Sequence, residues 1–280
     1  MKRLNLKTNP FLLWIMKRIE RNKNVILIIN GPTGSGKTFA GLRIACDIAE
    51  RLNTNFTIKD NVSFKFSKLL RKTMLPINEK PGTCFLFEEI GAIGGGASSR
   101  EWQSKANRFF NSFMQTTRYR QQILILTCPQ FSYLEKGTRQ LVHAQLEMIA
   151  INPQNKISIA KPYVLQINST SGKIYFKYLR FRYHDLRHKL KRLEFKLPPD
   201  DIVKDYDIMK REFTTQLNHE ILEADNPRPK RVSKIDYYIM DMLIKKKLSN
   251  QTIADKCHCS KSAVEKRAKV VGKSVKHHKK

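Results

Sequence analysis

The chain has 280 residues, of which 41% are hydrophobic, enough for a packed core and too many for a disordered polypeptide. Its 53 lysines and arginines against 24 acids give a net charge of +29, so we expect a polyanionic partner, with nucleic acid the first candidate. The apolar runs are shorter than a membrane span requires. The five cysteines do not show the spacing of a disulfide framework, and the sequence shows no signal-peptide pattern. We therefore expect a cytoplasmic protein with reduced thiols and no membrane segment.

The first part of the chain alternates between strand and helix patterns. Thr8, Asn9 and Pro10 precede apolar residues at helical spacing, which predicts an amphipathic helix there. The apolar run 25–29 predicts a strand, and the residues after the glycine loop that follows it predict a helix. Further strands are expected at 62–66, 83–89, 123–128 and 145–151, with a helix at 98–118. This alternation favours an α/β fold in which helices cover both faces of a parallel sheet.

The pattern changes after Pro153. The segments "YVLQIN" and "KIYFKYLRF" flank Ser169-Thr170-Ser171-Gly172, which predicts a β-hairpin appendage, and residues 198–224 show helical spacing. A basic, proline-bearing stretch then predicts a linker. We expect four parts: an α/β core with its N-terminal helix (1–155), a hairpin and helical extension (156–225), a linker (226–234) and a small C-terminal domain with a basic tail (235–280).

The loop "GPTGSGKT" matches the pattern G-x-x-x-x-G-K-[ST], and each part of it suits a nucleoside triphosphate. Glycines let successive N–H groups point inward as an anion nest at a helix N-terminus. Lys37 supplies a charge to the β and γ phosphates, and the Thr38 hydroxyl suits Mg²⁺. The predicted phosphate-binding residues are Gly31, Pro32, Thr33, Gly34, Ser35, Gly36, Lys37 and Thr38.

Two acids, Glu88 and Glu89, end the buried strand "CFLFEE". Paired carboxylates at this position are costly without a cation, and both are expected to face the nucleotide. We assign Glu88 to the Mg²⁺ shell, through water, and Glu89 to polarising the attacking water. A pair of exposed strand-end acids is the alternative.

The glycine loop, the strand ending "FEE" and an extra strand candidate between them resemble the additional-strand, catalytic-glutamate division of P-loop ATPases. Within that division residues 20–155 are similar to FtsK and HerA type motors, including DNA-packaging ATPases and zonula-occludens-toxin-like ATPases of viruses and plasmids. Glu88 stands where most of those relatives carry Asp. The resemblance implies an oligomer, possibly a ring, that hydrolyses ATP with Mg²⁺.

The resemblance also implies two further roles. Gln130 follows the strand "ILILTC" where such ATPases carry a polar sensor of the γ-phosphate, although a strand-exit glutamine is an equal interpretation. An arginine from a neighbouring subunit would complete the site, with Arg118 and Arg139 as first candidates and Arg120 as a third.

The C-terminal part concentrates positive charge, because residues 226–280 hold 16 lysines and arginines and only 4 acids. Such clustering argues against a merely lysine-rich surface. Residues 235–271 resemble a helix-turn-helix domain, with "NQTIADKC" and "SKSAVEKRAK" as its helix pair and Ala254 and Val264 between the helices. A helical bundle that contacts protein is the alternative. The expected DNA-contacting residues are Lys261, Ser262, Lys266, Arg267 and Lys269.

Together these patterns predict a DNA-stimulated ATPase of a virus or mobile element that packages or translocates duplex DNA. Two alternatives remain at this point. One is a replication or transposition helper ATPase that does not move along DNA, and the other is a DNA-binding regulator switched by nucleotide.

Overall fold

The computed structural model describes residues 9–88, 113–114, 117–183, 186–225 and 249–268. The chain divides into two compact units, residues 1–214 and 215–280, with the division inside helix α7 (Asp200–Asp225). Several predictions fall outside the described residues, namely those on Glu89, on most of the helix 98–118, on the linker 226–234 and on Lys269.

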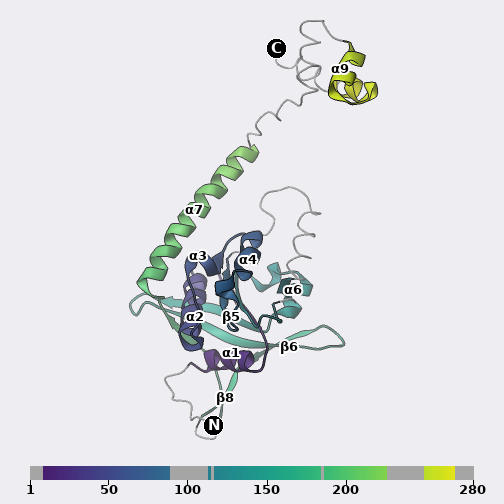
Figure 1. The fold of residues 1–280 in the computed structure, drawn as a ribbon. Coiled ribbons are helices and arrows are strands. Elements are labelled where there is room, and N and C mark those ends of the chain that lie inside the picture. Colours follow the sequence, from purple (N-terminus) through teal and green to yellow (C-terminus); the bar gives the residue numbers. More distant parts are fainter. Residues whose placement is uncertain (1–8, 89–112, 115–116, 184–185, 226–248, 269–280) are drawn as a thin grey trace. The chain divides into compact units, whose positions relative to one another are not determined.

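Figure 1 shows the larger unit as a sheet with helices packed on it. The order of strands in this mixed sheet is β10-β6-β5-β1-β4-β3-β2, with β7 also paired to β6. The strands β5, β1, β4, β3 and β2 are parallel, and β6 pairs antiparallel with β5, β7 and β10. Their bounds are β1 Val25–Asn30, β2 Val62–Ser63, β3 Cys84–Phe87, β4 Ile123–Cys128, β5 Ala144–Asn152, β6 Ile157–Ile167, β7 Ile174–Tyr178 and β10 Leu193–Lys196.

Helices cover both faces of this sheet, as the sequence predicts. Alternate residues of β1 enter different cores, since Leu27 packs on one face and Ile28 on the other. The first core takes residues of α1, α2 and α7, and the second takes residues of α4 and α6. The remaining bounds are α1 Pro10–Glu20, α2 Lys37–Leu52, α3 Ile58–Asn61, α4 Phe66–Thr73, η1 Pro76–Asn78, η3 Phe131–Tyr133 and α6 Lys136–Leu141.

The N-terminal helix α1 begins where the sequence predicts. The side chain of Asn9 accepts a hydrogen bond of 2.9 Å from the backbone N–H of Phe11, and Pro10 occupies the first helical position. Phe11 and Ile15 lie on the buried face of the helix, which anchors α1 to the first core.

The strand expected at 62–66 is shorter than predicted. Only Val62 and Ser63 pair with β3, because the Ser63 hydroxyl donates to the carbonyl of Lys65 and turns the chain into α4 at Phe66. This strand lies at the edge of the sheet. The strand between β1 and β3 is β4, which follows both of them in the chain.

The predicted hairpin forms, but it belongs to the main sheet and is not an appendage. β6 pairs with β7 around the turn at 168–172, and β6 also pairs with β5 along most of its length. The five strands predicted before Pro153 are parallel, as expected. The sheet continues beyond them with antiparallel strands, because the short turn after Asn152 can join only antiparallel strands. The stretch 173–181 divides at Leu179, after which β8 (Arg180–Tyr183) pairs with β9 (Leu186–Lys189) in a separate two-stranded ribbon.

In the second unit the structure describes two short helices joined by a tight turn. Helix α9 (Asn250–Cys257) is capped by Ser249, His258 adopts a left-handed conformation, and residues 261–268 form the next helix. Ile253, Ala254 and Val264 are buried between these helices. This small apolar cluster accounts for their crossing, because Ala254 allows a close approach.

Candidate functional site

The glycine loop lies at the carboxyl end of β1 and leads directly into α2, which begins at Lys37. Gly36 caps α2 with φ of 81°, a left-handed conformation that favours glycine. At Gly31 an added Cβ would lie 2.9 Å from the Cβ of Met148, so the loop packs too closely on β5 for any side chain. The sequence pattern thus has a direct structural reason at both glycines.

The polar groups of the loop are arranged around its backbone. The amino group of Lys37 donates to the carbonyls of Gly31 and Pro32, each at 2.8 Å, and so lies across the loop. The hydroxyl of Ser35 is buried and has no hydrogen-bond partner among the described residues. Thr38 is half-buried in the first turn of α2. An unpartnered buried hydroxyl beside a helix N-terminus and a lysine fits an anion-binding loop.

Glu88 follows β3 and is only 2% exposed. One carboxylate oxygen, Oε1, accepts a hydrogen bond of 3.4 Å from the hydroxyl of Thr127 on β4. The other, Oε2, accepts a hydrogen bond of 2.7 Å from the hydroxyl of Tyr206 and lies 3.7 Å from the amino group of Lys210. A buried carboxylate needs such partners, and α7 supplies two of the three.

Aromatic packing holds α7 in this position within the larger unit. The rings of Phe64 and Phe213 stack with centroids 4.5 Å apart, and the ring of Tyr206 packs edge-on against Phe39 of α2. The amino group of Lys210 lies 4.9 Å from the centroid of Phe64. Helix α7 is therefore connected both to Glu88 and to the helix that begins at the glycine loop.

The carboxyl ends of the parallel strands β3 and β4 lie at the same end of the sheet as the glycine loop. Glu88 and Thr127 come from β3 and β4, and the N–H of Gly31 donates to the carbonyl of Pro129 at 3.2 Å. Gln130 is the next residue; it is exposed, and its side-chain oxygen accepts from the hydroxyl of Ser132 at 3.3 Å. The structure thus brings the loop, Glu88 and the segment containing Gln130 to one edge of the sheet.

Of the two first arginine candidates, Arg118 lies away from the glycine loop of its own chain. Arg118 is exposed in the turn before β4. Ile123 pairs with Val25, so this amino end of β4 lies at the end of the sheet opposite the glycine loop. Six residues of strand separate the two ends by about 20 Å. Arg139 is half-buried in α6, and its Nε has no hydrogen-bond partner among the described residues. Arg118 therefore cannot reach the glycine loop of its own chain.

The predicted DNA-contacting residues that the structure describes lie on one helix. Ser260 accepts a hydrogen bond from the N–H of Ala263, and the helix 261–268 follows. Lys261, Ser262, Lys266 and Arg267 are all exposed on it.

Sequence reasoning missed the contribution of α7 to the site. Tyr206 lies 118 residues after Glu88, and nothing in the spacing of Tyr206 and Lys210 on an ordinary amphipathic helix distinguishes them from core and surface residues. Thr127 was also missed, although its place next to the end of a buried strand was a usable signal.

Comparison with solved structures found several similar chains. The structure resembles the crystal structure of the N-terminal domain of zonular occludens toxin from Neisseria meningitidis with a TM-score of 0.34 and 14% identity, over 59% of this chain and all of that one. No protein-family model matches the chain, and no curated protein does. Among the described residues no helix is long and apolar enough to cross a membrane. The mixed α/β fold itself is compatible with a P-loop nucleotide-binding protein.

Proposed function

We propose that this protein is an ATP-hydrolysing motor that acts on DNA, most simply in packaging or translocation for a virus or mobile element. One observation carries the nucleotide part of the proposal. A glycine loop with the residues of a phosphate cradle joins the buried parallel strand β1 to a helix N-terminus, at the same end of the sheet as the carboxyl ends of β4 and, beyond it, β3. This is the arrangement in which α/β sheets bind phosphates.

The loop residues fit a triphosphate. The backbone N–H groups at the start of α2 and the hydroxyl of Ser35 would hold phosphate oxygens. The amino group of Lys37 lies against the same loop, where it donates to the carbonyl of Gly31. ATP with Mg²⁺ supplies a phosphoryl group that water attacks. The chain's own task is then to hold the nucleotide in one orientation and to keep the attacking water polarised.

The acids divide these tasks in our proposal. The hydroxyl of Thr38 and the carboxylate of Glu88 would hold Mg²⁺, the latter through water, and Glu89 would accept the proton of the attacking water. The cation that a buried carboxylate requires is Lys210 in this structure. We infer that Lys210 helps to hold the carboxylate of Glu88 in place for Mg²⁺.

The DNA part of the proposal rests on charge and on the tail. The net charge of +29 suits a polyanion, and the exposed cations Lys261 and Lys266 on a short capped helix suit DNA phosphates. An assembly of several copies, with Arg118 reaching a neighbour's nucleotide, completes the proposal.

A nucleotide titration and an ATPase assay test the proposal directly. Lys37→Ala should abolish ATP binding, because the loop loses the cation directed at the phosphates, whereas the exposed Lys59→Ala should bind like wild type. Equal ATP affinity of the Lys37→Ala protein would refute the phosphate cradle.

The motor assignment needs a second measurement. ATP turnover should rise with the length of duplex DNA supplied. Turnover that duplex DNA raises equally at every length would favour the non-translocating helper, and binding with almost no hydrolysis would favour the nucleotide-switched regulator.

A further inference from the structure

The ribbon of β8 and β9 lies in the most basic stretch of the larger unit. Residues 173–196 contain nine lysines and arginines and two acids, and all nine basic side chains are exposed. The ribbon pairs with no other strand among the described residues. An isolated two-stranded ribbon is only marginally stable, so its sequence would be expected to favour its own pairing.

The residues that face each other across the two strands instead disfavour the pairing. Arg180 lies directly opposite Lys189, and Arg182 lies directly opposite Arg187. Side chains two residues apart share a face, so all four cations lie on one face of the ribbon. Like charges placed opposite each other destabilise a sheet. None of the four forms an ion pair with another residue that the structure describes.

The other face of the ribbon carries the packing that keeps it formed. The rings of Phe181 and His188, which are also directly opposite each other, stack with centroids 5.6 Å apart. The ribbon is joined to the core at its base, where the N–H of Leu190 donates to the carbonyl of Leu179 at 2.8 Å. One face is thus structural, and the basic face is left for a ligand.

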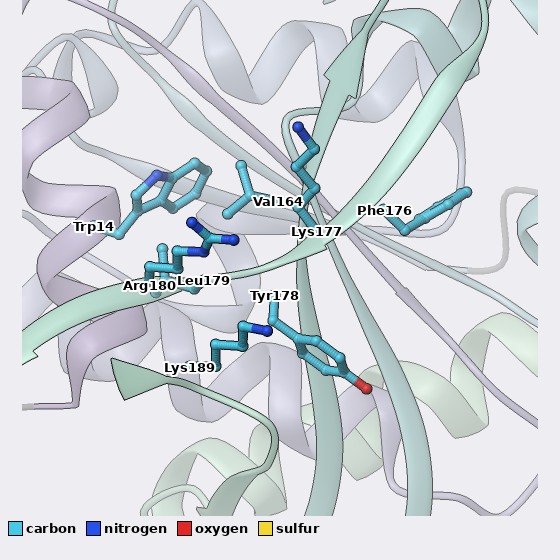
Figure 2. Close-up of a pocket in the computed structure, with 8 residues that line it drawn as sticks. All are labelled: Trp14, Val164, Phe176, Lys177, Tyr178, Leu179, Arg180 and Lys189. Carbon is cyan, nitrogen blue, oxygen red and sulfur yellow. The ribbon is translucent and has the colours of Figure 1, made fainter. Parts of the chain in front are cut away.

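A pocket of about 540 Å³ continues the basic face toward the sheet. Figure 2 shows Arg180 and Lys189 among its lining residues, together with Lys177 of β7, the ring of Trp14 from α1 and Tyr178. A fifth cation therefore lies beside the first cross-strand pair. The pocket thus brings three cations, Lys177, Arg180 and Lys189, together with the ring of Trp14 and the apolar side chains of Val164 and Leu179.

We propose that the basic face of the β8–β9 ribbon is a DNA-binding surface of the core, separate from the tail, and that its ligand is the phosphate backbone of duplex DNA. Phosphates relieve the repulsion between the paired cations, which explains why such pairs are tolerated. A two-stranded ribbon also has the dimensions to enter a major groove. This inference rests on the proposed DNA-dependent function, and it names the surface of the core that would contact the DNA.

The test measures the affinity of full-length protein for mixed-sequence duplex DNA over a range of salt concentrations. Arg182→Gln/Arg187→Gln should weaken binding and lower the slope of log K against log salt by about 2, one unit for each lost phosphate contact. Because it removes like-charge repulsion, the same variant should unfold at no lower a urea concentration than wild type. That combination separates loss of binding from loss of fold.

A matched control removes the same charge elsewhere. Lys59 and Lys68 are exposed on α3 and α4, near the edge strand β2, whereas the ribbon lies in the chain between β7 and β10, which pair with β6 on the other side of the sheet. Lys59→Gln/Lys68→Gln should leave the salt slope unchanged. Equal slopes for the ribbon variant and wild type would overturn this inference alone and leave a DNA-dependent ATPase in place. Wild-type protein that binds no duplex DNA would overturn both, while ATP turnover measured without DNA would still report the nucleotide site.

Discussion

The hydroxyl of Tyr206 donates a hydrogen bond of 2.7 Å to Oε2 of Glu88, joining the carboxyl end of β3 to a helix residue 118 positions later in the chain. Lys210, one helical turn farther along, places its amino group 3.7 Å from the same oxygen. This contact makes α7 part of the candidate nucleotide site.

Removing the Tyr206 hydroxyl should therefore be costly. Tyr206→Phe leaves a buried carboxylate oxygen without its shortest hydrogen bond, which should lower the free energy of unfolding by about 1.5–3 kcal/mol. Urea denaturation measures this, and the exposed Tyr133→Phe is the control, with no change expected. A Tyr206→Phe protein as stable as that control would show that the hydrogen bond is unimportant. If Glu88 also holds Mg²⁺, the Mg²⁺ concentration for half-maximal turnover should rise in the same variant.

Glu89→Gln should preserve ATP binding and stop turnover, because the amide keeps the shape of the side chain and loses the charge that polarises water. Filter binding of ATP and steady-state hydrolysis separate the two effects. Unchanged hydrolysis would transfer the role to another acid, and Glu88→Gln is then the variant to compare.

The position of Arg118 at the edge opposite the glycine loop predicts that it acts only between subunits. Arg118→Ala should lose turnover, and mixing it with the Lys37→Ala protein should restore part of it, since the second protein supplies an intact arginine to the first protein's nucleotide site. The double variant Lys37→Ala/Arg118→Ala should restore nothing when mixed in the same way. Failure of both mixtures, in assemblies shown to exchange subunits, would exclude Arg118.

The tail should contribute to DNA binding independently of the nucleotide site. Lys261→Gln/Lys266→Gln should weaken duplex binding and lower its salt slope, because both cations are exposed on the second short helix. ATP affinity should not change. A tail variant that binds DNA like wild type would favour a protein-contact role for this unit.

His143 predicts a loss of stability in acid. Its Nδ1 accepts a hydrogen bond of 3.0 Å from the N–H of Ile26, which requires a neutral ring. Burial lowers the pKa of His143 to about 3, with a smaller contribution from the charges of Arg18 and Lys23. The unfolded chain takes up this proton near pH 6.5, so the free energy of unfolding should fall between pH 6.5 and 3, by up to about 1.4 kcal/mol per pH unit.

A variant isolates this effect from general acid denaturation. His143→Asn keeps an acceptor near the position of Nδ1 and does not titrate, so its stability should depend less on pH in that window. His219→Asn, on the exposed surface of α7, is the control. Identical pH profiles for the two variants would contradict the role of His143.

Local sequence was sufficient for much of this protein. The glycine loop, the cap of α1 at Asn9 and the strands β1 and β4 follow from residues that are adjacent in the chain, because turn chemistry, capping and the buried apolar runs are short-range properties. The sequence also predicts that Glu88 lies at the same end of the sheet as the glycine loop, since the carboxyl ends of parallel strands lie together.

Other features were decided only by the tertiary structure. One such feature is the strand order, in which β4 lies between β1 and β3. Another is the place of β6 in the main sheet, since the pairing of β6 with β5 depends on strand register, which composition does not specify. The alignment of Arg182 with Arg187 is also a matter of register. The contact of Tyr206 with Glu88 depends on where α7 packs, which the sequence of α7 alone does not specify, because a helix with one apolar face can cover any matching surface.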